Sequence, residues 1–78
     1  MMSLTMATPG SEVRLVAING DVQLKQRLAD LGMNIGMTVC VMADSRDGRL
    51  IVAVKDSRLA LGRGVAHKVM VESTKVTP

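Results

Sequence analysis

The sequence predicts a mainly β domain with one inserted α-helix, arranged as a small barrel of about five strands. Short apolar stretches alternate with frequent turn signals along most of the 78-residue chain. One segment breaks that pattern and carries apolar residues at helical spacing instead. The chain contains no Phe, Tyr or Trp, so its core must consist of Val, Leu, Ile, Ala and Met. A chain of this length forms one small domain that buries about 60–65% of its unfolded surface.

The beginning of the chain carries no clear pattern. Residues 1–8 are expected to be a flexible lead-in, and residues 9–76 to form the folded domain. Pro9 and Gly10 together are a turn signal at this boundary. No internal repeat or low-complexity tract divides the rest of the chain.

The first predicted strand covers residues 12–18. Val13 and Leu15 share one face of this strand, because side chains alternate along it. Val16 and Ile18 lie on the opposite face, or on the same one if a bulge shifts the alternation. An Asn-Gly turn follows this strand and leads into the helix.

The predicted helix is the segment around which the rest of the chain is arranged. Its apolar residues recur at i, i+4 and i+7 and form one stripe that is expected to cover the barrel. The intervening residues are mainly polar, as expected for the outer side of an amphipathic helix. The stripe consists of Leu24, Leu28 and Leu31, and the polar residues are Lys25, Gln26, Arg27 and Asp30.

Both ends of the helix carry recognisable signals. Asn19 or Asp21 is expected to cap the first turn, because a short side-chain acceptor satisfies a free N–H there. Gly32 is expected to end the helix in a left-handed conformation, and Met33 to fold back onto Leu28. Gly36 then follows in a turn that starts the next strand.

The second half of the chain predicts the remaining strands. A polar loop with Gly48, available for positive φ, separates the second strand from the third. The third strand is apolar on both faces and is expected to be central. A tight reversal at Asp56 and Ser57 follows, with Asp56 tolerating the left-handed region. The predicted strands are residues 38–43, 49–55, 58–61 and 69–76, and residues 65–68 form a helical turn.

Several kinds of chemistry lack their usual residues in this sequence. Cys40 and His67 have no further Cys or His to complete a zinc site, so we expect no metal site and no cofactor. Asp44 and Asp47 are interpreted as solvated turn residues. Ser57 has no orienting carboxylate predicted near it. We therefore expect no catalytic residue and no small-molecule substrate.

Two kinds of binding remain open. The chain is mildly basic, with a net charge of +3, and a basic face would attract phosphate groups of nucleic acid. The absence of aromatic rings disfavours single-stranded nucleic acid, which is usually held by stacking. The alternative is protein binding through apolar residues at the two ends of the helix, rimmed by cations. The basic residues of the second half are Arg46, Arg49, Lys55, Arg58, Arg63 and Lys68.

The order of several short motifs resembles a known family. Arg27-Leu28 is followed by Leu31-Gly32-Met33, and Leu59-Ala60-Leu61 by Ala66 and Val69, within VRLVAINGDVQLKQRLADLGMNIGMTVCV and GRLIVAVKDSRLALGRGVAHKVMVE. This arrangement resembles FeoA, the small cytoplasmic accessory protein of bacterial ferrous iron transport. The resemblance runs from about Pro9 to Glu72. It implies an SH3-like β-barrel with an inserted helix, without catalysis and without an iron site of its own.

The resemblance also implies a partner. FeoA acts with FeoB, a membrane permease with a cytoplasmic GTPase domain, so the chain is expected in the cytoplasm or at the inner membrane through that partner. FeoA-like domains also occur at the C-terminus of metal-dependent repressors. The alternative function is therefore that of a small regulatory or nucleic-acid-binding module. Weak self-association is left open. The expected contact with FeoB consists of Val22, Lys25, Gln26, Arg27, Met33 and Met37.

Overall fold

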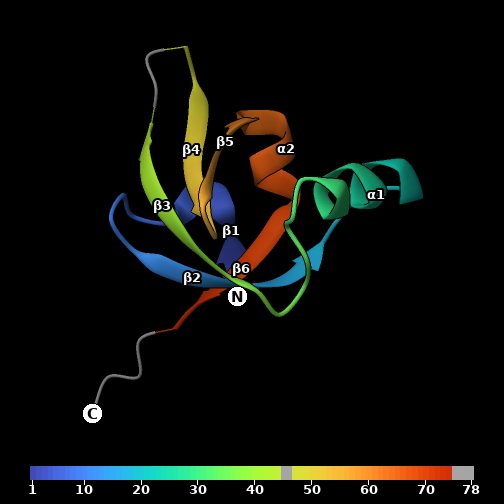
Figure 1. Ribbon diagram of the computed structural model, residues 1–78, viewed down its shortest axis with the longest axis horizontal. Helices are drawn as coiled ribbons and strands as arrows, with labels where there is room; N and C mark the ends of the chain where they lie inside the picture. Colours follow the sequence, from blue (N-terminus) through green and yellow to red (C-terminus); the bar gives the residue numbers. More distant parts are fainter. Residues whose placement is uncertain (45–46, 75–78) are drawn as a thin grey trace.

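A six-stranded antiparallel sheet forms most of the protein. The computed structural model describes residues 1–44 and 47–74. The strand order is β1-β6-β2-β3-β4-β5, and the sheet curls around the core, as Figure 1 shows. Within the described residues β1 and β5 are the two edges, so the barrel is open. The elements are β1 (Met2–Ser3), the 3₁₀ helix η1 (Leu4–Met6), β2 (Glu12–Ile18), α1 (Val22–Asp30), β3 (Thr38–Asp44), β4 (Arg49–Val54), β5 (Ser57–Gly62), α2 (Arg63–Lys68) and β6 (Val69–Ser73).

The predicted fold class, mainly β with an inserted helix, is confirmed. The structure adds β1 to the five expected strands and extends the expected helical turn into α2. β4 lies between β3 and β5, as its two apolar faces predicted. The register of β2 shifts between Leu15 and Ala17 against β6. This bulge places Ile18 in the core together with Val13 and Leu15, as the second of the two expected alternatives has it, while Val16 is only half-buried.

The N-terminal segment is folded, so the expectation of a flexible lead-in is wrong for residues 2–7. Met2 pairs with Val71 and Ser3 with Met70 at the edge of the sheet. Leu4 is completely buried, and Ala7 also belongs to the core. A two-residue strand is too short to show alternation. The tertiary pairing with β6 therefore determines this structure, and local sequence does not.

The β4–β5 hairpin reverses one residue earlier than predicted. Val54 pairs with Ser57, so Lys55 and Asp56 form the loop. Lys55 has a φ of 54°, and it occupies the left-handed region that was assigned to Asp56. In the loop that precedes β4, Gly48 has the expected positive φ, 86°.

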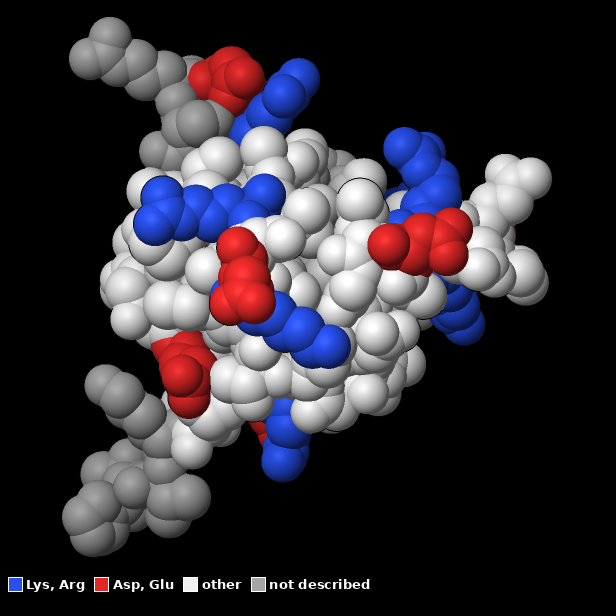
Figure 2. Space-filling view, in the orientation of Figure 1, with Lys and Arg blue, Asp and Glu red and all other residues white. Residues whose placement is uncertain are grey.

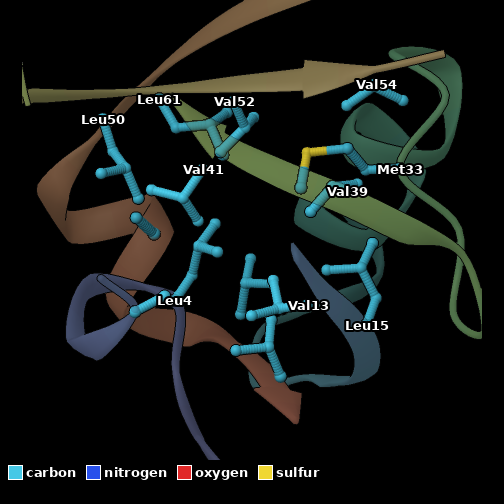
Figure 3. Close-up of a cluster of buried hydrophobic side chains, with 14 of the residues drawn as sticks. Leu4, Val13, Leu15, Met33, Val39, Val41, Leu50, Val52, Val54 and Leu61 are labelled. Atoms are coloured by element: carbon cyan, nitrogen blue, oxygen red, sulfur yellow. The ribbon is translucent and has the colours of Figure 1, made fainter. Parts of the chain in front are cut away.

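The core is aliphatic and lies inside the curl of the sheet. Figure 3 shows Met33 beside Val39, with other branched side chains around them. Met33 is 1% exposed, so it is a core residue. Other fully buried side chains come from η1 and from four of the strands: Leu4, Val13, Leu15, Val39, Val41, Val52, Val69 and Val71.

Helix α1 begins and ends as its sequence predicts. The Asp21 carboxylate accepts a hydrogen bond from the Leu24 N–H at 2.9 Å, so Asp21 is the N-cap. At the other end the Met33 N–H donates to the Leu28 carbonyl oxygen at 2.8 Å. The Gly32 N–H donates to the carbonyl oxygen of Ala29 at 2.9 Å. Together these bonds form a Schellman motif, which requires Gly32 at a φ of 92°.

Gly32→Ala is expected to destabilise the domain by about 1–2 kcal/mol, because an L-residue is strained in the left-handed region. A Cβ at this position would meet Val54 at 3.7 Å, an ordinary contact, so the cost comes from the backbone. Gly64→Ala, inside α2 and without a close neighbour, is the matched control and should stabilise by about 0.5–1 kcal/mol. Urea denaturation measures both variants. Equal effects at the two glycines would contradict the assigned role of Gly32.

Candidate functional site

Helix α1 projects from the side of the sheet and is buried along only part of its apolar stripe (Figure 1). Leu28 is 2% exposed and belongs to the core. Leu24 is half-buried and packs against that core. Leu31 is 48% exposed, so the expectation that it is a core residue is wrong. The helix ends before Leu31, and the Schellman turn places Met33 in the core instead.

The residues expected to contact a partner separate into an exposed group on α1 and two methionines that are wholly or partly buried. Val22, at the first turn of α1, is 80% exposed. Lys25, Gln26 and Arg27 are also exposed. The prediction of a surface position for Met33 is wrong, because its side chain is buried.

Met37 is half-buried and packs against the core. Its N–H donates to the Asn34 carbonyl oxygen at 3.1 Å, in a turn that contains Gly36 at a φ of 93°. This side chain therefore offers less surface to a partner than those of α1.

Two hollows lie on opposite sides of α1. The first, which we call the α1–β5 groove, has a volume of about 170 Å³. The second, which we call the Ile35 hollow, has a volume of about 180 Å³. The α1–β5 groove is lined by Leu24, Arg27, Leu28, Leu31, Ala60, Leu61, Gly62 and Val65. The Ile35 hollow is lined by Ile18, Lys25, Ala29, Met33, Asn34 and Ile35.

Sequence reasoning found only one wall of the α1–β5 groove. The helical wall was identified through its leucine stripe and Arg27. The opposite wall comes from β5 and α2, far away in the sequence. The only sequence feature that marks the opposite wall is the small size of Ala60 and Gly62 in an apolar segment. That feature does not predict a groove unless the fold is known.

The basic side chains are dispersed over the face that Figure 2 shows, where Lys and Arg lie beside Asp and Glu. Arg14 forms an ion pair with Glu72. Arg49 lies 3.5 Å from the carboxylate of Asp47. Arg46 is outside the described residues. This mixture of charges gives no support on that face to the nucleic-acid alternative.

The potential metal ligands are also dispersed. Among residues 1–44 and 47–74, no three His, Cys, Asp or Glu side chains are grouped so that they could hold a metal ion. Cys40 is a half-buried free thiol. None of the described helices combines the length and the apolar character needed to cross a membrane.

Comparison with known proteins places the chain in a family. The model of the FeoA domain matches residues 2–73. The chain belongs to the FeoA family. It is 37% identical over 75 residues to a candidate Fe(2+) transport protein A of Methanocaldococcus jannaschii, covering 96% of this chain and 90% of that protein.

Solved structures of FeoA proteins have the same fold as this chain. A crystal structure of an iron uptake regulatory protein, FeoA, is 32% identical, with a TM-score of 0.82 over 91% of this chain and 93% of that one. FeoA from Chlorobium tepidum has a TM-score of 0.86 at 21% identity, over 95% and 71% of the two chains. The predicted SH3-like fold is therefore confirmed.

The same fold occurs within a larger protein. ScaR with bound Zn²⁺ matches 94% of this chain with a TM-score of 0.85, although the match covers only 37% of ScaR. The identity is 19%, so this likeness concerns the fold alone.

Proposed function

We propose that this FeoA-family chain is a non-catalytic accessory module of ferrous iron transport that docks onto the cytoplasmic, GTPase-containing part of an FeoB-like permease. The names of its relatives support the pathway. The observation that supports docking is the pair of exposed apolar side chains at the two ends of α1: Val22, in its first turn, is 80% exposed, and Leu31, its C-cap, is 48% exposed. Leu31 also lines the α1–β5 groove beside Leu24 and Val65, and a contiguous, partly exposed apolar patch of this kind indicates a site of protein contact.

The cations of α1 support the same interpretation. Lys25 lies at the Ile35 hollow and Arg27 at the α1–β5 groove, on the two sides of the helix. A rim of positive charge around apolar residues attracts a partner with acidic groups and orients it. The helix is anchored by Leu28 and by its two caps, so its outer side is presented without a change of fold.

Modulation of the partner follows from binding only if the affinity differs between the partner's states. We therefore expect the chain to bind the GDP-bound and GTP-analogue-bound forms of the FeoB cytoplasmic part with different dissociation constants. Titration calorimetry with each nucleotide form measures this difference. Equal affinities would leave docking intact but contradict modulation through the nucleotide state.

The double variant Lys25→Glu and Arg27→Glu is expected to weaken binding to the FeoB cytoplasmic part by about tenfold or more, or about 1.4 kcal/mol. Both side chains are exposed, so the far-UV circular dichroism should remain that of the wild type. A control, Arg14→Glu with Arg49→Glu, makes the same change of net charge on the sheet; both arginines are ion-paired, so its circular dichroism is compared with the wild type in the same way. If the control weakens binding as much as the helix variant, α1 is not the contact.

A further inference from the structure

We propose that the α1–β5 groove receives an extended segment of the partner, which adds to the free edge of β5 as a further strand. The segment has alternating apolar side chains and a carboxylate that faces Arg27. This inference rests on the docking function proposed above and specifies how docking occurs. Four features of the structure support it: the free edge, the line of the groove, the open space along it and the charge.

The backbone at the edge of β5 is available for pairing. β5 is the last strand in the sheet order of the described chain. In an antiparallel ladder, alternate residues direct their N–H and C=O groups toward the neighbouring strand, and the others direct theirs away. Ser57 follows the two-residue loop, so its backbone N–H and C=O groups are directed toward β4. The same holds for the backbone groups of Leu59 and Leu61. Arg58 and Ala60 therefore direct their backbone groups outward.

The groove follows this edge. Ala60, Leu61 and Gly62 are consecutive, so their side-chain positions alternate between the two faces of the sheet, yet all three line the groove. A hollow that touches three consecutive residues of β5 follows the strand over this stretch. The opposite wall is apolar and partly exposed, with Leu24 from α1 and Leu31 from the residue that follows it. A strand laid along β5 would bury its inward side chains against these leucines.

The edge lacks the obstacles that usually prevent strand addition. Natural edges are blocked by proline, bulges or inward charges. Here the register between β4 and β5 is regular from end to end. Ala60 is small and exposed, and a Cβ added at Gly62 would have no neighbour within 4 Å. Arg58, the second residue of β5 and close to the loop, is the one charged side chain in this strand.

The size of the groove favours a strand over a helix. Its volume of about 170 Å³ suits a single row of side chains. A helix has a diameter of about 10–12 Å with its side chains and would rest on the rim without using the backbone groups of β5.

The charge around the groove indicates what the segment carries. Arg27 lines it, and within the described residues neither Arg27 nor Arg58 forms an ion pair. A carboxylate on the incoming strand would satisfy these guanidinium groups. A second copy of this chain would bring the same two cations to the interface, so the charge favours a different protein.

The experiment uses Ala60→Pro, which removes the outward N–H and places a ring on the free edge. Proline is tolerated there because that N–H does not belong to the β4 ladder. Binding of the FeoB cytoplasmic part is expected to weaken by about tenfold or more. The conservative variant Ala60→Ser keeps both the N–H and a small side chain, and it is expected to bind as the wild type does. Circular dichroism establishes that both variants are folded.

Hydrogen exchange of the wild-type chain provides a second measurement that needs no variant. The Ala60 amide should exchange rapidly in the free chain and become protected in the complex. Unchanged exchange at Ala60 in a complex that forms would overturn strand addition while docking stands. Failure of the wild type to bind the FeoB cytoplasmic part at all would overturn the docking function, and this inference with it. Dimerisation of the wild type alone through the β5 edge would identify a second copy as the occupant and would also overturn the proposal.

Discussion

Leu28→Asp is expected to unfold the domain. Leu28 is 2% exposed and joins α1 to the core beside the Schellman turn. The substitution removes a buried aliphatic side chain, which costs about 2–5 kcal/mol, and adds the cost of desolvating a carboxylate without a partner. A domain of this length has only about 4–12 kcal/mol of stability in total. Far-UV circular dichroism and thermal unfolding at neutral pH measure the loss.

Leu31→Asp is the matched control on the same stripe. Its side chain is 48% exposed, so a carboxylate there remains hydrated. The expected change in unfolding free energy is within about 1 kcal/mol, because surface substitutions rarely exceed that range. If Leu28→Asp instead melts cooperatively near the wild-type temperature, α1 does not anchor the core in the way described here.

The two leucines also illustrate where prediction from the sequence succeeds and where it fails. The i, i+4, i+7 pattern identified a helix and correctly placed Leu28 in the core. The pattern does not fix how far the helix extends before the chain turns. Gly32 ends it after nine helical residues, and Met33 replaces Leu31 inside. Both the stop signal at Gly32 and the return of Met33 onto Leu28 are predictable from the sequence.

The sheet was predictable where alternation is long enough to be read. The first predicted strand coincides with β2, and even its bulge was one of two alternatives. The turn at Lys55 was not predictable, because a lysine with positive φ is imposed by the pairing of Val54 with Ser57. The α1–β5 groove depends on residues that only the fold brings together. Local patterns therefore gave the elements, and the candidate site required their arrangement.

Leu4→Ala is expected to destabilise the domain by about 2–5 kcal/mol, the range for a large aliphatic residue truncated in a packed core. Leu4 is completely buried, and η1, which carries it, packs against α2 and β6. The melting temperature should fall by about 8 °C or more, since about 1 kcal/mol corresponds to about 4–8 °C in a domain of this size. Differential scanning calorimetry measures the shift.

Met6→Ala, in the same 3₁₀ helix, provides the comparison, because Met6 is 71% exposed. It should change the melting temperature by no more than about 4 °C. Equal, small effects of the two variants would mean that the N-terminal segment is detached in solution. A large effect of Leu4→Ala alone would establish that β1 and η1 complete the core. The match to the FeoA domain, which begins at residue 2, agrees with that outcome.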